Sequence, residues 1–177
     1  GSAKLQLTTQ ALMKFNPEFF SVTFGAGGST KEKTLETVLR IKDLGCNSVP
    51  HISCISSTRD EIHELLMRYK SNSIKDLVVL RGDNPSGVVS NGEFKYANEL
   101  VSFIRSETSN YFNIHVAAYP ECHPEANSST DDVDNFERKV LAGANGAITQ
   151  FFFNVDAYFR FIEECQLRGI GIPIVPG

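Results

Sequence analysis

The chain alternates between short apolar runs and amphipathic stretches at a nearly constant interval. The apolar runs are centred near residues 20, 48, 78, 116, 148 and 174, about 31 residues apart. Each interval has room for one helix, and a strand–helix–strand crossover of this length makes successive strands parallel. The sequence therefore predicts an α/β fold built from six βα units.

The expected elements follow from apolar periodicity and from helix start and stop signals. Strands are expected over residues 19–24, 47–52, 77–80, 113–118, 147–152 and 172–175. Helices are expected over residues 3–14, 33–44, 58–69, 96–106, 130–142 and 155–168. Ser29 or Thr30 is predicted to cap the second helix, and Thr58 with Glu61 to form a capping box on the third.

Two architectures are compatible with this rhythm: an open doubly wound sheet, and a (β/α)8 TIM barrel of which the chain covers about six βα units. A complete barrel at this spacing needs about 250 residues. The segment Gly25-Ala26-Gly27-Gly28-Ser29 lacks the spacing of a dinucleotide-binding turn. Polar groups at the ends of five different strands suit a closed ring better than a single crevice, so the barrel is favoured.

Those polar groups form the candidate site. They are Thr23, His51, the segment Leu80-Arg81-Gly82-Asp83, the segment 119–123 and Gln150. Carboxyl ends of parallel strands meet at one edge of a sheet, which is where α/β enzymes build their active sites. Arg81 could meet a phosphate or carboxylate there. The alternative is a turn at Asp83-Asn84-Pro85 with Arg81 paired to Asp83.

The expected helix 130–142 carries a second polar group. Asp132, Asn135 and Lys139 follow at i, i+3 and i+7, with Arg138 beside them. Such a face is either solvated or meets a ribose and a pyrophosphate. A zinc site combining His51, Cys54, Cys122 and His123 is a weaker alternative, because the spacings match no common zinc motif.

Composition restricts the class of protein. A net charge of −4 and a pI near 5.6 argue against a nucleic-acid partner. The chain has no apolar run approaching the roughly 18 residues of a membrane span. Its four cysteines show no CxxC pairing, which is typical of reduced thiols and predicts a cytoplasmic protein. Gly1-Ser2 is interpreted as a tag remnant, with a single domain over residues 3–177.

Several motifs together resemble one family, the bacterial-type, FAD-dependent methylenetetrahydrofolate reductases. The motifs are Ser21-Val22-Thr23-Phe24-Gly25-Ala26-Gly27-Gly28-Ser29, Pro50-His51-Ile52-Ser53-Cys54, Leu80-Arg81-Gly82-Asp83, Ala117-Ala118-Tyr119-Pro120-Glu121-Cys122-His123-Pro124-Glu125-Ala126 and Ala147-Ile148-Thr149-Gln150-Phe151-Phe152-Phe153. The resemblance implies a (β/α)8 barrel that binds FAD. It also implies reduction of 5,10-methylenetetrahydrofolate to 5-methyltetrahydrofolate by NADH or NADPH in a ping-pong sequence. That reaction belongs to folate one-carbon metabolism and methionine biosynthesis.

The resemblance also implies roles for individual residues. The FAD-binding positions are Thr23, His51, Arg81, Gly82, Asp83, Tyr96, Ala97, Tyr119, His123, Ala126, Asp132, Asn135, Arg138 and Lys139. Asp83 is implied as the catalytic residue and as a folate contact, and Gln150 as a second folate contact. No metal is implied, and a homo-oligomer is expected for the full-length protein.

The family's first strand carries a Glu-Phe-Phe-Pro-Pro-type motif whose glutamate is the general acid. No residue here matches it: Glu18 aligns with the segment entering the second strand of the family. The family's first and last strands are both expected to lie outside this sequence. Two other functions stay open, a non-catalytic flavin-binding barrel remnant and a metal-dependent barrel hydrolase or lyase.

Overall fold

The computed structural model describes residues 2–24, 28–55, 57–82 and 92–177. In this part of the chain, helices and strands alternate, which confirms the predicted α/β class. The strands form one sheet in the order β1-β2-β3-β4-β5-β6, and every neighbouring pair is parallel. Sequence order and spatial order coincide, which is the connectivity of a barrel rather than of a doubly wound sheet.

The strands are short. They are β1 (Phe20–Val22), β2 (Ser48–Ser53), β3 (Asp76–Leu80), β4 (Asn113–Ala118), β5 (Gly146–Thr149) and β6 (Ile174–Val175). The helices are α1 (Ser2–Met13), α2 (Gly28–Asp43), α3 (Arg59–Ser71), α4 (Ala97–Thr108), α5 (Ser129–Leu141) and α6 (Val155–Leu167).

Two local predictions about caps had different outcomes. The capping box of α3 is confirmed: the backbone N–H of Glu61 donates to Thr58 Oγ1 at 3.3 Å, and the Thr58 N–H donates to Glu61 Oε2 at 3.0 Å. The predicted cap of α2 is wrong, because that helix begins at Gly28 and so includes Ser29 and Thr30.

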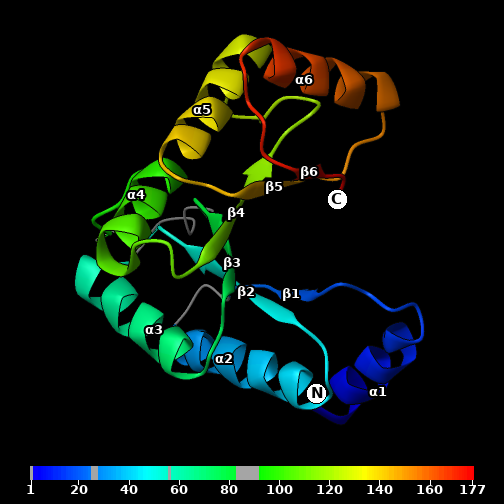
Figure 1. The fold of residues 1–177 in the computed structure, drawn as a ribbon, viewed down its shortest axis with the longest axis vertical. Helices are drawn as coiled ribbons and strands as arrows, with labels where there is room; N and C mark the ends of the chain where they lie inside the picture. Colours follow the sequence, from blue (N-terminus) through cyan, green and yellow to red (C-terminus); the bar gives the residue numbers. More distant parts are fainter. Residues whose placement is uncertain (1, 25–27, 56, 83–91) are drawn as a thin grey trace.

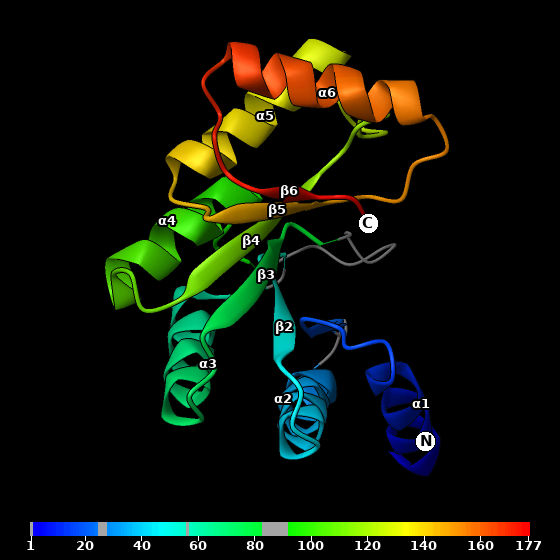
Figure 2. The ribbon, with the colours of Figure 1, turned by 45° about the vertical axis from the view of Figure 1, so that its right-hand side comes forward.

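The sheet curls into part of a barrel. Helices α2 to α6 follow one another along its outer side, and no helix of the described residues covers its inner side in either view (Figures 1 and 2). The arrangement agrees with a partial TIM-type barrel, and the count of eight strands stays a prediction. Among the described residues, no helix combines the length and the apolar character needed to cross a membrane.

The core lies between the sheet and the outer helices. Alternate strand residues point outward and are fully buried there, among them Ile52, Leu77, Val79, Ile114 and Val116. The intervening residues point to the inner side and are mostly only half-buried, among them His51, Ser53, Leu80, Ala117 and Ile148. The inner side of the sheet is therefore the accessible one.

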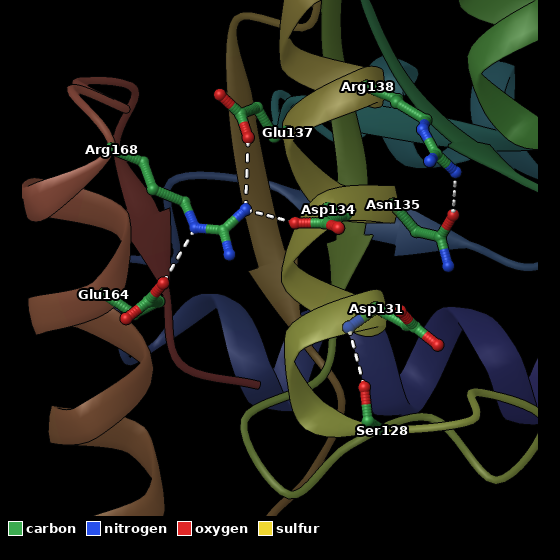
Figure 3. A network of polar contacts seen from close by, with 8 residues as sticks. All are labelled: Ser128, Asp131, Asp134, Asn135, Glu137, Arg138, Glu164 and Arg168. Atoms are coloured by element: carbon green, nitrogen blue, oxygen red, sulfur yellow. Dashed lines mark hydrogen bonds and ion pairs between the residues drawn. The ribbon is translucent and has the colours of Figure 1, made fainter.

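A cluster of ion pairs joins the last two helices (Figure 3). The Arg168 guanidinium, just after α6, donates to Glu164 at 2.8 Å and to Glu137 of α5 at 3.2 Å, and also pairs with Asp134 of α5. The cluster therefore fixes the C-terminal end of α6 against α5.

Candidate active site

The predicted polar residues do collect at one edge of the sheet. Thr23, Arg81, Tyr119 and Gln150 directly follow β1, β3, β4 and β5. Because the strands are parallel and adjacent, their carboxyl ends lie side by side. This edge is the C-terminal face, where TIM-type barrels carry their chemistry.

Three further predicted residues, His51, Tyr96 and Ala97, lie close to the edge. His51 lies inside β2, half-buried in register with Val78 of β3, and burial lowers the pKa of its imidazole. Tyr96 and Ala97 begin α4: Tyr96 is exposed and Ala97 is buried. Thr23 and Gln150 are exposed, with their backbones held by Thr34 and Ala118 respectively.

The backbone at the exit of β3 is fixed by β2. The Arg81 carbonyl accepts hydrogen bonds from Ser53 Oγ at 2.8 Å, Cys54 Sγ at 3.3 Å and the Ile55 N–H at 3.0 Å. Gly82 has φ +83°, and a Cβ there would lie 2.0 Å from Ser53 Oγ. The positive φ and the nearby Ser53 hydroxyl therefore favour glycine at this position, whether or not Gly82 contacts a cofactor.

The side chain of Arg81 forms an ion pair with Glu125 of the β4–α5 loop. The pairing raises the pKa of the guanidinium and lowers the pKa of the Glu125 carboxyl, through the hydrogen bond and the opposite charge. Nε of Arg81 is buried and finds no hydrogen-bond partner among the described residues. Sequence reasoning gave Glu125 no role, although its place in the motif 119–126 could have pointed to one.

The β4–α5 loop is folded on itself around His123. The imidazole packs edge-to-face on Tyr119 with ring centroids 4.5 Å apart, and its Nδ1 accepts from the Glu125 N–H at 3.0 Å. Its backbone carbonyl accepts from the Ala126 N–H at 2.9 Å. Cys122 takes φ +73°, an uncommon conformation that places its neighbours in this turn. The loop therefore presents Tyr119, His123 and Glu125 as one unit.

Asp132 and Lys139 of α5 support this loop from within. Asp132 is buried and accepts from the His123 N–H at 3.0 Å; burial raises the pKa of its carboxyl, although that hydrogen bond and the Lys139 charge oppose the effect. Nζ of Lys139 donates to the Ala117 carbonyl at 2.5 Å, and burial lowers the pKa of this ammonium to about 8. Both charges are thus engaged by the protein itself.

The other two predicted residues of α5 are exposed. Arg138 donates to Asn135 Oδ1 at 2.8 Å, and the pair lies on the opposite side of α5 from the Arg168 cluster (Figure 3). The polar face expected from the sequence is therefore divided: Asp132 and Lys139 serve the loop and the end of β4, while Asn135 and Arg138 are accessible.

Asp83, the residue expected to be catalytic, lies outside the described residues. No cluster of three or more metal-ligating side chains occurs in the described ranges. The thiol of Cys54 donates instead to the Arg81 carbonyl, and that of Cys122 to the His123 carbonyl.

Curated relatives of the chain share one description. The 5,10-methylenetetrahydrofolate reductase of Escherichia coli K12 is 44% identical over 167 residues, covering 94% of this chain and 55% of that protein. The enzyme of the same name from Buchnera aphidicola of Schizaphis graminum is 41% identical over 98% of this chain and 59% of its own. A probable methylenetetrahydrofolate reductase (NADH) of Oryza sativa is 38% identical over 94% of this chain and 30% of its own length. The chain spans just over half the length of these bacterial relatives.

Two solved structures share the fold at low identity. One is an uncharacterised Clostridium thermocellum protein that binds two copies of 5-methyl-5,6,7,8-tetrahydrofolic acid, with TM-score 0.54 and 16% identity over 94% of this chain and 68% of that one. The other is oxaloacetate acetylhydrolase in complex with 3,3-difluorooxalacetate, with TM-score 0.62 and 9% identity over 96% of this chain and 71% of that one. At these identities the likeness concerns the fold alone.

The family model described as methylenetetrahydrofolate reductase matches residues 1–177, the whole chain. Together with identities of 41–44% to curated bacterial enzymes over nearly all of the sequence, this match shows that the chain belongs to the methylenetetrahydrofolate reductase family.

Proposed function

We propose that the full-length protein reduces 5,10-methylenetetrahydrofolate to 5-methyltetrahydrofolate with NADH or NADPH through bound FAD. The observation that carries the proposal is 44% identity to the Escherichia coli reductase over 94% of this chain. The accessible polar edge of the sheet supports it, since that edge is where a barrel of this type holds its ligands.

The residues present fit an anionic ligand with hydroxyl groups. Arg81 offers a guanidinium whose buried Nε lacks an acceptor among the described residues, and Arg138 offers an exposed second cation. Asn135 and Tyr96 present exposed polar groups beside them. FAD, when bound, supplies the two-electron hydride chemistry that protein side chains lack.

The residues of the candidate site then have distinct roles. Arg81 and Arg138 bind phosphate oxygens, and the Tyr119–His123 pair provides an aromatic wall. The main role of Asp132 is to position the β4–α5 loop, and the main role of Lys139 is to hold the end of β4. Gln150, exposed at the end of β5, donates to folate, and Asp83 provides the negative charge that stabilises a cationic iminium form of the folate.

The proposed reaction order is ping-pong, with the nicotinamide leaving before folate takes the same face. We also propose a homo-oligomer in the cytoplasm, acting in one-carbon metabolism and methionine biosynthesis. The four cysteines are free thiols, which supports a reducing compartment.

The test uses the purified full-length protein. We expect visible flavin absorbance, its bleaching by NADH or NADPH under anaerobic conditions, and its recovery when methylenetetrahydrofolate is added. Bound flavin without either half-reaction would favour a non-catalytic flavin-binding barrel. Stoichiometric zinc without flavin would favour a metal-dependent hydrolase or lyase.

A matched pair of variants tests the placement of the cofactor. Arg138→Ala should weaken FAD binding tenfold or more, because a charged hydrogen bond contributes roughly 1.5–3 kcal/mol. Arg40→Ala removes an exposed arginine from the C-terminal part of α2 instead and should leave FAD affinity unchanged. Equal affinities in the two variants would contradict this placement.

A further inference from the structure

The ion pair between Arg81 and Glu125 joins two elements of the candidate site. Arg81 follows β3, and Glu125 belongs to the β4–α5 loop, 44 residues later. Both partners are anchored: the Arg81 carbonyl accepts three hydrogen bonds, and the Glu125 N–H donates to His123 Nδ1. The fold therefore holds the backbones of both residues in positions from which the two side chains can pair.

The pair is nevertheless easy to replace. The Glu125 side chain is 65% exposed and that of Arg81 is 34% exposed. Only one terminal nitrogen of the guanidinium contacts the carboxylate, while Nε has no partner in the described part of the chain. Exposed ion pairs contribute little net free energy, so an incoming anion meets a low cost when it takes over the guanidinium.

A phosphate group is the stronger partner. The diphosphate of FAD carries two negative charges, one on each phosphate, and has several acceptor oxygens, which allows the bidentate geometry that guanidinium groups favour. A neutral ligand gains nothing from Arg81 and leaves the internal pair intact.

We propose that Glu125 competes with the phosphate groups of the ligand for Arg81 and so lowers the affinity of the site for phosphorylated ligands without affecting neutral ones. The inference rests on the proposed function in one respect, that Arg81 meets the cofactor. In the absence of ligand, the Glu125 carboxylate occupies the position on Arg81 that a phosphate group takes when the ligand binds. It weakens binding of every phosphorylated ligand by the cost of its displacement.

The experiment measures dissociation constants for FAD, riboflavin and inorganic pyrophosphate on the full-length apoprotein. Glu125→Gln keeps the shape of the side chain and removes its charge. We expect FAD and pyrophosphate to bind about two- to fivefold more tightly to this variant, the range that an exposed ion pair accounts for. Riboflavin, which has no phosphate, should bind as it does to the unchanged protein.

Two controls separate this effect from a general change in charge or in folding. Asp131→Asn removes one negative charge from the first turn of α5 and leaves the Arg81–Glu125 pair intact. It should leave all three affinities unchanged. In an Arg81→Ala background, Glu125→Gln should have no further effect, because the competition needs the guanidinium. Thermal unfolding of each variant verifies that it is folded.

Unchanged or weaker FAD and pyrophosphate binding by Glu125→Gln would overturn the inference and make Glu125 a positioning residue for Arg81. An equal gain for riboflavin would overturn it too. A protein that binds pyrophosphate but not FAD would defeat the proposed function, while the pyrophosphate arm would still decide the role of Glu125.

Discussion

Gly82 shows how closely β2 and β3 approach at the edge of the site. Its φ of +83° disfavours any side chain, and the hydroxyl of Ser53 occupies the place where a Cβ would lie. The same hydroxyl donates to the Arg81 carbonyl. Gly82 therefore stabilises the position of Arg81 whether or not it contacts a cofactor.

Gly82→Ala should destabilise the protein by about 2–4 kcal/mol, combining left-handed backbone strain with overpacking. The matched control is Gly45→Ala, which has φ +87° but nothing within 4 Å of the added Cβ. It should cost only the strain, about 1–2 kcal/mol. Urea unfolding of both variants measures the difference in unfolding free energy. Equal losses of stability would show that the Ser53 side chain can move away from the added Cβ at no cost in free energy.

Asp83→Asn tests the residue that the family resemblance makes catalytic. If its carboxylate lies beside the flavin ring, removing the charge raises the two-electron potential, because the anionic reduced form loses a repulsive neighbour. A repulsion of about 1–2 kcal/mol corresponds to roughly 20–40 mV. Hydride transfer to folate should slow by more than the potential explains, since the iminium loses its counter-charge.

A redox titration and stopped-flow measurements of both half-reactions distinguish this from a structural role. An Asp83 that only shapes the turn predicts an unshifted potential, lower stability and equal losses in the two half-reactions.

At the scale of residues, the sequence could predict which side chains reach the edge of the sheet but not how they pair. Arg81 was expected to meet Asp83 or a ligand, and the described structure shows it with Glu125. That contact depends on the turn at Cys122, whose positive φ has no signal in the residue type. Long-range pairs of this kind follow from loop conformation, which local patterns do not specify.

At the scale of elements, α5 combines two tasks on one helix. Lys139 ties it to the end of β4, and the buried ammonium has its pKa lowered from 10.5 to about 8. Between these two values the unfolded chain binds more protons than the folded one. The contribution of Lys139 to stability is therefore greatest above pH 10.5 and is lost as the pH falls through about 8.

Lys139→Met should remove this dependence. From pH 8 to 10 the unfolding free energy of the unchanged protein should rise relative to the variant by about 1–3 kcal/mol. Cys54 and Cys165, whose pKa values burial raises to about 11, act in the opposite direction, but they cancel in the comparison. Lys42→Met, which removes an exposed ammonium, is the control. A difference for Lys139 that changes with pH no more than the difference for Lys42 would contradict the assignment.

The types and order of the helices and strands were predictable, because the hydrophobic period and the segment length indicate the same element in each βα unit. The boundaries of the elements were less predictable. The fifth strand was predicted over residues 147–152 and so included Phe151 and Phe152, yet β5 ends at Thr149, and Phe151 and Phe153 are exposed. Apolar character alone cannot distinguish a buried strand from aromatic residues at the rim of a site.

At the scale of the whole molecule, the described sheet has two edges and an accessible inner side. In the described ranges β1 pairs only with β2, and β6 only with β5. Parallel sheets are normally buried on both faces, and open edges pair with other chains. The two edges agree with the six βα units expected from the sequence, because a barrel of eight strands needs two more to close.

The 177-residue chain expressed alone should therefore self-associate through these edges. Sedimentation velocity should show a weight-average mass that rises with protein concentration. Val175→Lys places a charge on the β6 edge, where Val175 is 47% exposed, and should shift the distribution toward monomer because a charged edge disfavours strand pairing. Val155→Lys makes the same substitution at the start of α6, where the side chain is 55% exposed but lies on no sheet edge, and should leave association unchanged.

A chain that stays monomeric at every concentration would mean that its edges are covered by other means. Equal effects of the two substitutions would locate the association on the apolar surface near α6 instead of at the open side of the sheet.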